Sequence, residues 1–143
     1  MSTQIQPYLF FGGRCQEALD FYAKALGAEV EMVLRFDESP HPMPEGMLAP
    51  GFEKKVMHSQ FRVGGALVLC SDGCRAEDGG FHGFSLVLNV ADEAEAHRYF
   101  DAIAADGGTV NMPLAKTFWS PCYGMVKDKF DVHWQVMVPG TNS

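Results

Sequence analysis

The feature that most constrains this chain is an internal duplication. Residues 17–22 read EALDFY and residues 95–100 read EAHRYF, and each segment has the apolar spacing of an amphipathic helix that runs toward a glycine. The segments around the two helices also follow one another in the same order. With 143 residues, the chain is long enough for two small modules but not for several large domains. We therefore predict a fold made from two copies of one unit.

Apolar alternation predicts the same order of elements in both halves. In the first half we predict a strand over 4–11, a helix that ends at Gly27, and strands over 28–36, 56–63 and 66–71. In the second half we predict a strand over 84–90, a helix that opens at Asp92, and strands over 109–112, 123–127 and 132–138. Asp92 stands three residues before Glu95, which is the spacing of a helix-capping pair. The order βαβββ, used twice, predicts an α+β fold.

Two irregular segments are a linker between the predicted modules and an insertion within the first. Residues 71–83 are rich in Gly, Asp and Ser, so we place the boundary there and predict modules over 1–75 and 76–143. Residues 37–55 carry four prolines and interrupt the first module as an insertion loop. A loop of this length is either a lid or binding arm, or a mobile surface segment.

Composition limits the partners of the chain. The net charge of −7 and the lack of clustered Lys and Arg argue against nucleic acid, because such a surface must neutralise phosphates. The longest apolar runs are far shorter than the roughly 20 residues of a membrane span, and the chain does not open with a signal pattern. Four cysteines without a C-x-x-C pair fit a reducing compartment. We expect a cytoplasmic protein that binds neither membrane nor nucleic acid.

Several motifs resemble those of one known family: PYLFFGG at 7–13, CQEALDFY at 15–22, HSQF at 58–61, TFW at 117–119 and DKFDVHW at 128–134. Together they make the chain similar to the PhnB-like family, whose members are labelled 3-demethylubiquinone-9 3-methyltransferase, within the vicinal oxygen chelate (VOC) superfamily of glyoxalases and bleomycin-resistance proteins. The resemblance implies two βαβββ modules that form a curved mixed sheet, with helices on one side and a small-molecule pocket on the concave side. Asp131 stands where the family has glycine, and we expect it to adopt left-handed backbone, which Asp tolerates.

Strand alternation, combined with this resemblance, assigns side chains to the concave face. In the last strand Trp134, Val136 and Val138 form the buried row, which leaves His133 and Gln135 for the pocket. The same alternation places three further residues in the pocket and turns three apolar residues of the first strand toward its helix. The pocket residues are Gln6, Tyr8 and Ser85, and the helix-facing residues are Ile5, Leu9 and Phe11.

The resemblance also locates the positions where metal-dependent superfamily members hold their ion. These positions are Gln6, Leu69 or its neighbour Val68, Ser85 and Gln135. Two amides, a hydroxyl and an aliphatic side chain supply no anionic or imidazole donor. We therefore predict no metal at this site. The chain also lacks a glycine-rich loop for S-adenosylmethionine after its first strand, so we predict no cofactor.

Four residues have a predicted role at the pocket, three of them with an alternative. Trp119 and Tyr123 flank a turn-rich segment, and we expect both at the pocket rim, where aromatic side chains bind ligands with little entropy loss. Core packing of Trp119 is the alternative. His58 either contacts the ligand or belongs to the polar face of a half-exposed strand, and His133 acts as a general base or as a pocket wall.

Three functions stay open on these grounds. The first is a metal-independent protein that binds a small, partly apolar molecule. The second is a lyase, isomerase or transferase that uses a histidine base or a metal held in a nonstandard way. The third is a structural dimer with a vestigial pocket. The absent anionic ligands favour the first, and we expect a homodimer because the superfamily often pairs modules from different chains.

Overall fold

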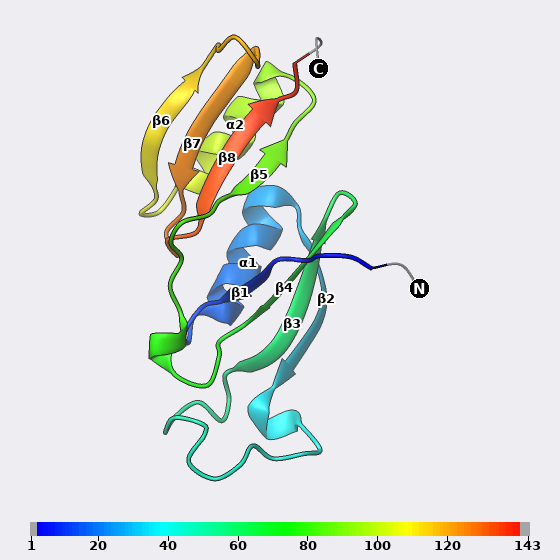
Figure 1. The fold of residues 1–143 in the computed structure, drawn as a ribbon, viewed down its shortest axis with the longest axis vertical. Coiled ribbons are helices and arrows are strands. Elements are labelled where there is room, and N and C mark those ends of the chain that lie inside the picture. The colour runs from blue at the N-terminus through cyan, green and yellow to red at the C-terminus, as the bar shows by residue number, and fades with distance from the viewer. Residues whose placement is uncertain (1–2, 141–143) are drawn as a thin grey trace. The chain divides into compact units, whose positions relative to one another are not determined.

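The computed structural model of the protein describes residues 3–140. The chain divides into two compact units, with the division between Gly80 and Phe81. Within residues 3–140, each unit contains one α-helix and a four-stranded mixed sheet, shown in Figure 1. The predicted α+β class and the repeated βαβββ order are therefore confirmed. None of the helices within residues 3–140 is long and apolar enough to cross a membrane.

The first unit has the sheet order β1-β4-β3-β2. Its elements are β1 (Tyr8–Phe10), α1 (Cys15–Leu26), β2 (Glu29–Arg35), β3 (Val56–Val63) and β4 (Ala66–Ser71), with short 3-10 helices η1 (Phe36–Glu38) and η2 (Ala76–Asp78). β1 runs parallel to β4, whereas the β2–β3 and β3–β4 pairs are antiparallel. The third and fourth strands have the bounds predicted from the sequence.

Helix α1 is fixed at both ends by features that the sequence contains. Gly27 ends the helix in a left-handed conformation with φ +66°, as a glycine at this position favours. At the start, the buried carboxylate of Asp72 accepts hydrogen bonds from the backbone N–H groups of Gly13 (2.7 Å) and Cys15 (2.8 Å), and its other oxygen accepts from Val56 (2.9 Å). Asp72 therefore ties the helix to the end of β4 and the start of β3, since buried acceptors of this kind need several donors.

The first strand corrects one part of the prediction. Leu9 and Phe11 are buried as expected, but Ile5 is 98% exposed. The strand begins only at Tyr8, because its pairing with β4 starts at the Tyr8–Leu69 register. Before Tyr8 the chain is not a strand, so apolar alternation does not indicate which way its side chains point. The prediction that Ile5 faces the helix was therefore wrong.

The insertion loop begins earlier than predicted and is attached to its own unit. β2 ends at Arg35, and Phe36 enters η1 instead of extending the strand, because the Glu38 carboxylate accepts the Arg35 N–H at 2.8 Å. Farther along, Ala49 N–H donates to the carbonyl of Cys74 (2.8 Å), and the Arg75 guanidinium donates to the carbonyl of Met47 (3.0 Å). The loop is thus held against the segment that follows β4.

The second unit repeats the topology with the sheet order β5-β8-β7-β6. Its elements are β5 (Leu86–Asn89), α2 (Glu93–Ala104), β6 (Thr109–Ala115), β7 (Cys122–Lys127) and β8 (His133–Val138). Asp92 caps α2 by accepting the Glu95 N–H at 2.9 Å, as predicted. The buried face of α2 consists of Ala96, Phe100 and Ile103, and the helix lies across one face of the sheet (Figure 1).

The turn between β7 and β8 depends on a buried carboxylate. Asp128 is 1% exposed; its Oδ1 accepts the N–H groups of Phe130 (2.9 Å) and Val132 (3.0 Å), and its Oδ2 accepts the indole N–H of Trp134 (2.9 Å). Asp131 takes φ +71°, which confirms the expected left-handed backbone at this position. The turn therefore fixes the register that sends alternate β8 side chains to opposite faces of the sheet.

Candidate functional site

The side chains of β8 divide between the two faces of the second sheet. Trp134, Val136 and Val138 are buried, as predicted, whereas His133 and Gln135 are only partly buried. The open face is the one away from α2. Strand alternation thus provides a row of polar and aromatic side chains on a rigid sheet, which is the usual way to hold a binding group in one orientation.

Gln135 lies at the centre of a hydrogen-bonded row on this face. The Tyr123 hydroxyl donates to Gln135 Oε1 at 2.8 Å, and Gln135 Nε2 donates to Ser85 Oγ at 2.9 Å. Tyr123 belongs to β7, Gln135 to β8, and Ser85 directly precedes β5, so the row crosses three neighbouring strands. Both ends of the Gln135 amide therefore have a hydroxyl partner, and the side chain is held between them.

Trp119 extends this row with a second aromatic ring. Its indole contacts the Tyr123 ring edge to face, with centroids 5.3 Å apart and planes at 70°, and it remains 46% exposed. The turn that carries Trp119 is held by buried Ser120, whose hydroxyl donates to the carbonyl of Val138 at 2.6 Å and accepts the Cys122 N–H at 3.1 Å. Trp119 is therefore a half-exposed aromatic on a fixed turn, and not a buried core residue.

A cavity of about 390 Å³ lies beside the Ser85 end of the row. It includes Ser85 and His133, which the sequence predicts for the pocket, together with four residues that it does not: His82, Gly83, Phe84 and Met125. Met125 pairs with Gln135 across β7 and β8, so its place on the open face follows from the register. β5 begins at Leu86 and not at the predicted Phe84, so alternation does not determine the directions of His82 and Phe84.

The remaining predicted pocket residues belong to the first unit. Tyr8 Oη and His58 Nδ1 lie 3.0 Å apart, within hydrogen-bonding distance, and the Tyr8 ring stacks on Phe10 with centroids 4.9 Å apart. Burial raises the pKa of the Tyr8 phenol above its ordinary value, so the hydroxyl stays neutral at physiological pH. Gln6 lies before β1 and is half-buried. The eight predicted residues are thus three in the first unit and five in the second.

The residues at the superfamily's metal positions do not fit a divalent ion. Ser85 and Gln135 are bonded to each other, and Gln135 Oε1 already accepts the Tyr123 hydroxyl. Neither residue carries a charge, and divalent ions of this class prefer carboxylate or imidazole donors. Within residues 3–140, no group of three or more His, Cys, Asp or Glu side chains is arranged to hold a metal ion.

Two βαβββ units with an open sheet face define the class of the protein. The fold is that of the VOC superfamily: a glyoxalase and bleomycin-resistance domain from Frankia gives a TM-score of 0.64 at 12% identity, and the fosfomycin resistance protein FosX from Listeria monocytogenes, with Mn(II), gives 0.65 at 11%. These two likenesses show the fold alone.

The sequence match is more specific. The family described as 3-demethylubiquinone-9 3-methyltransferase matches residues 3–137, and the chain belongs to this PhnB-like family. Protein YjdN of Escherichia coli K12 is 34% identical over 94% of both chains. The structure of PA1353 from Pseudomonas aeruginosa is 39% identical with a TM-score of 0.81, covering 97% of this chain and 99% of that one. The PhnB protein of Bacillus cereus is 28% identical with a TM-score of 0.78, covering 95% and 99%.

Proposed function

We propose that the protein binds a small, partly apolar molecule on the open face of the second sheet, without a metal ion. The observation that carries this proposal is the continuous row from Trp119 through Tyr123 and Gln135 to Ser85. The row combines a half-exposed indole with an oriented amide and two hydroxyl groups. Small-molecule sites generally contain such a mixture, in which apolar surface supplies affinity and a few polar groups fix the orientation.

The row indicates which kind of ligand fits. A planar or aromatic group would lie on the exposed part of Trp119, because stacked rings gain both area burial and favourable quadrupole contacts. A polar group of the ligand would reach Ser85 and His133 in the adjoining cavity, whose volume of about 390 Å³ is in the range of small-molecule pockets. The half-buried His133 acts in this proposal as a wall and hydrogen-bonding group.

The residues of this chain favour binding over the reaction that the family's description names. The family's description names a methyltransferase, but the chain has no glycine-rich loop after its first strand for S-adenosylmethionine. FosX was crystallised with Mn(II), whereas Ser85 and Gln135, which the resemblance assigns to the superfamily's metal positions, are neutral side chains bonded to each other. A metal-independent binding function agrees best with this donor set.

We further propose that the protein is a cytoplasmic homodimer. The open sheet faces expose apolar side chains, including Tyr8 and Phe10 in the first unit and Val87 and Met112 in the second. Exposed apolar groups of this kind are typical of surfaces that a partner covers. Free cysteines, of which Cys15, Cys70 and Cys122 are buried, agree with a reducing compartment.

The test of the binding proposal is a ligand screen followed by one matched pair of variants. Native mass spectrometry of protein purified without chelator shows any retained molecule, and a thermal-shift screen of neutral heteroaromatic compounds supplies further ligands. Gln135→Leu should weaken the best ligand about tenfold, since it removes a hydrogen-bonding group from the site. The control Gln60→Leu makes the same change on β3 of the first unit, where Gln60 donates to Glu31 at 3.1 Å. Equal loss in both variants would refute the proposed site.

A further inference from the structure

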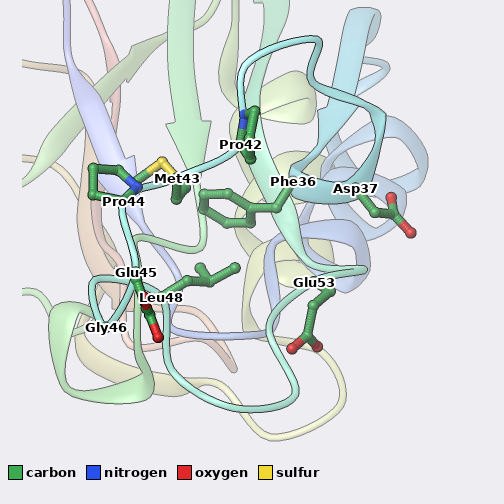
Figure 2. Close-up of a pocket in the computed structure, with 9 residues that line it drawn as sticks. All are labelled: Phe36, Asp37, Pro42, Met43, Pro44, Glu45, Gly46, Leu48 and Glu53. Atoms are coloured by element: carbon green, nitrogen blue, oxygen red, sulfur yellow. The ribbon is translucent and has the colours of Figure 1, made fainter.

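The insertion loop of the first unit encloses a second cavity, of about 320 Å³. Figure 2 shows three apolar side chains that point toward one another in it: Phe36, Met43 and Leu48. Pro42 and Pro44 complete the apolar wall, and Phe36 is almost entirely buried. The cavity lies within residues 36–53 and is therefore separate from the row on the second sheet. Its volume is at the lower end of the range found for small-molecule pockets.

The base of the loop is closed by backbone hydrogen bonds. Phe36 N–H donates to the carbonyl of Lys55 (3.2 Å), and Asp37 N–H donates to the carbonyl of Glu53 (2.8 Å). The tip is turned by the bond from Met47 N–H to the carbonyl of Pro44 (3.1 Å). The prolines of the loop further reduce the conformational freedom of the unfolded chain, which favours the folded loop. The cavity is therefore built into the loop, and a ligand would not have to order the segment in order to bind.

The charged residues that line the cavity are all acidic. Asp37, Glu45 and Glu53 line it, and no Lys, Arg or His does. Asp37 is compensated by Lys54, whose Nζ lies 3.4 Å from its Oδ2. Among the described residues no ion pair involves Glu45 or Glu53. A ligand for this cavity must therefore offer an apolar body to the Phe36 wall and a positive charge to the two free carboxylates.

We propose that this cavity is a binding site for a small amine that carries an apolar body, and that it is independent of the site on the second sheet. Phe36, Met43 and Leu48 contact the apolar body, while one of the rim carboxylates, Glu45 or Glu53, pairs with the ammonium group. The chain's net charge of −7 acts in the same direction, because it favours the approach of cations. Both carboxylates are exposed, so their preference for a charged over a neutral ligand is small and weakens as the salt concentration rises.

Three probes share a phenyl group and differ in charge: 2-phenylethylamine, 2-phenylethanol and phenylacetate. Comparing their affinities distinguishes the contribution of charge from that of apolar contact. Nitrogen–proton correlation spectra of the full chain, recorded during titration with each probe, give both the affinity and the location. The amine should bind about three- to tenfold more tightly than the alcohol, and the carboxylate more weakly than either. The shifted resonances should lie within residues 36–53. Equal affinities for amine and alcohol, or shifts confined to other residues, would overturn the proposal.

Variants provide the second arm of the experiment. Glu45→Gln with Glu53→Gln should abolish the preference for amine over alcohol and leave the alcohol affinity unchanged. The matched control, Asp101→Asn with Asp106→Asn, changes the net charge equally on exposed positions of the second unit, and Asn tolerates the φ of +61° at Asp106. If the Glu45→Gln, Glu53→Gln variant still prefers the amine over the alcohol, the two rim carboxylates do not select the ligand. The same conclusion follows if the control variant loses that preference to the same extent. Met43→Gln should weaken amine and alcohol by the same factor.

Discussion

Replacement of Trp119 by alanine separates the two roles that the sequence leaves open for this residue. A pocket aromatic loses ligand affinity when it is removed, whereas a core aromatic mainly loses folding stability. Trp119 keeps 46% of its surface exposed and contacts Tyr123 on one side. We therefore expect Trp119→Ala to weaken ligand binding more clearly than it weakens folding.

The expected magnitude follows from the exposed area. A tryptophan side chain buries at most about 250 Å², so roughly 115 Å² of Trp119 remains for a ligand to cover. A planar ligand covers about half of that area, which corresponds at about 25 cal/mol per Å² to about 1.4 kcal/mol, or roughly tenfold in Kd. The cost in folding free energy should be about 1–2 kcal/mol, below the roughly 3–5 kcal/mol of a buried tryptophan.

The assay combines ligand titration with chemical denaturation, and Trp134 provides the matched control. Trp134 is 4% exposed and bonded to Asp128, so Trp134→Ala should cost about 3–5 kcal/mol of folding free energy. Acrylamide should quench Trp119 and not Trp134 in the free protein, and a bound ligand should protect Trp119. If Trp119→Ala destabilises the fold as much as Trp134→Ala and leaves the Kd unchanged, the pocket assignment is wrong.

Four further predictions concern the metal, the assembly and the β7–β8 turn. Elemental analysis of protein purified without chelator should find no stoichiometric zinc, nickel or manganese; metal that disappears in a Gln6→Ala, Gln135→Ala double variant would contradict this. Sedimentation should give a dimer of about twice the chain mass of 15.7 kDa, and a monomer at tens of micromolar would contradict it. Asp128→Ala should lower the unfolding free energy by about 3–5 kcal/mol in urea denaturation, because three buried N–H groups lose their acceptor. Asp131→Gly should raise the midpoint of thermal unfolding by a few degrees, because glycine adopts its φ of +71° without strain, and a lowered midpoint would contradict this.

Local signals in the sequence predict most of the fold. Gly27, the Asp92–Glu95 pair and the alternation from Trp134 to Val138 each depend on residues close in the chain, and each is found as predicted. Ile5 fails because a strand period has meaning only where a partner strand exists, and β1 pairs only from Tyr8 onward. The predicted end of β2 is wrong for a different reason: the bond between Glu38 and the Arg35 N–H starts a 3-10 turn at Phe36.

The candidate site was predictable in part. Alternation identifies His133 and Gln135 on the open face, but it does not show that Gln135 bonds both Tyr123 and Ser85. Those bonds depend on the register between strands that are distant in the sequence. The contribution of Met125 to the neighbouring cavity depends on the same register. The second cavity was not predictable at all, because no period describes a proline-rich loop and its shape depends on bonds to residues 53–55.

The most direct test of the central claim is a map of amide chemical shifts on binding of the tightest neutral ligand from the thermal-shift screen. The largest changes should fall around the row on the second sheet, at Ser85, Trp119, Tyr123 and Gln135. They should persist unchanged when a chelator is added. Changes that leave these four residues unaffected, or that vanish with the chelator, would contradict a metal-independent site on the second sheet.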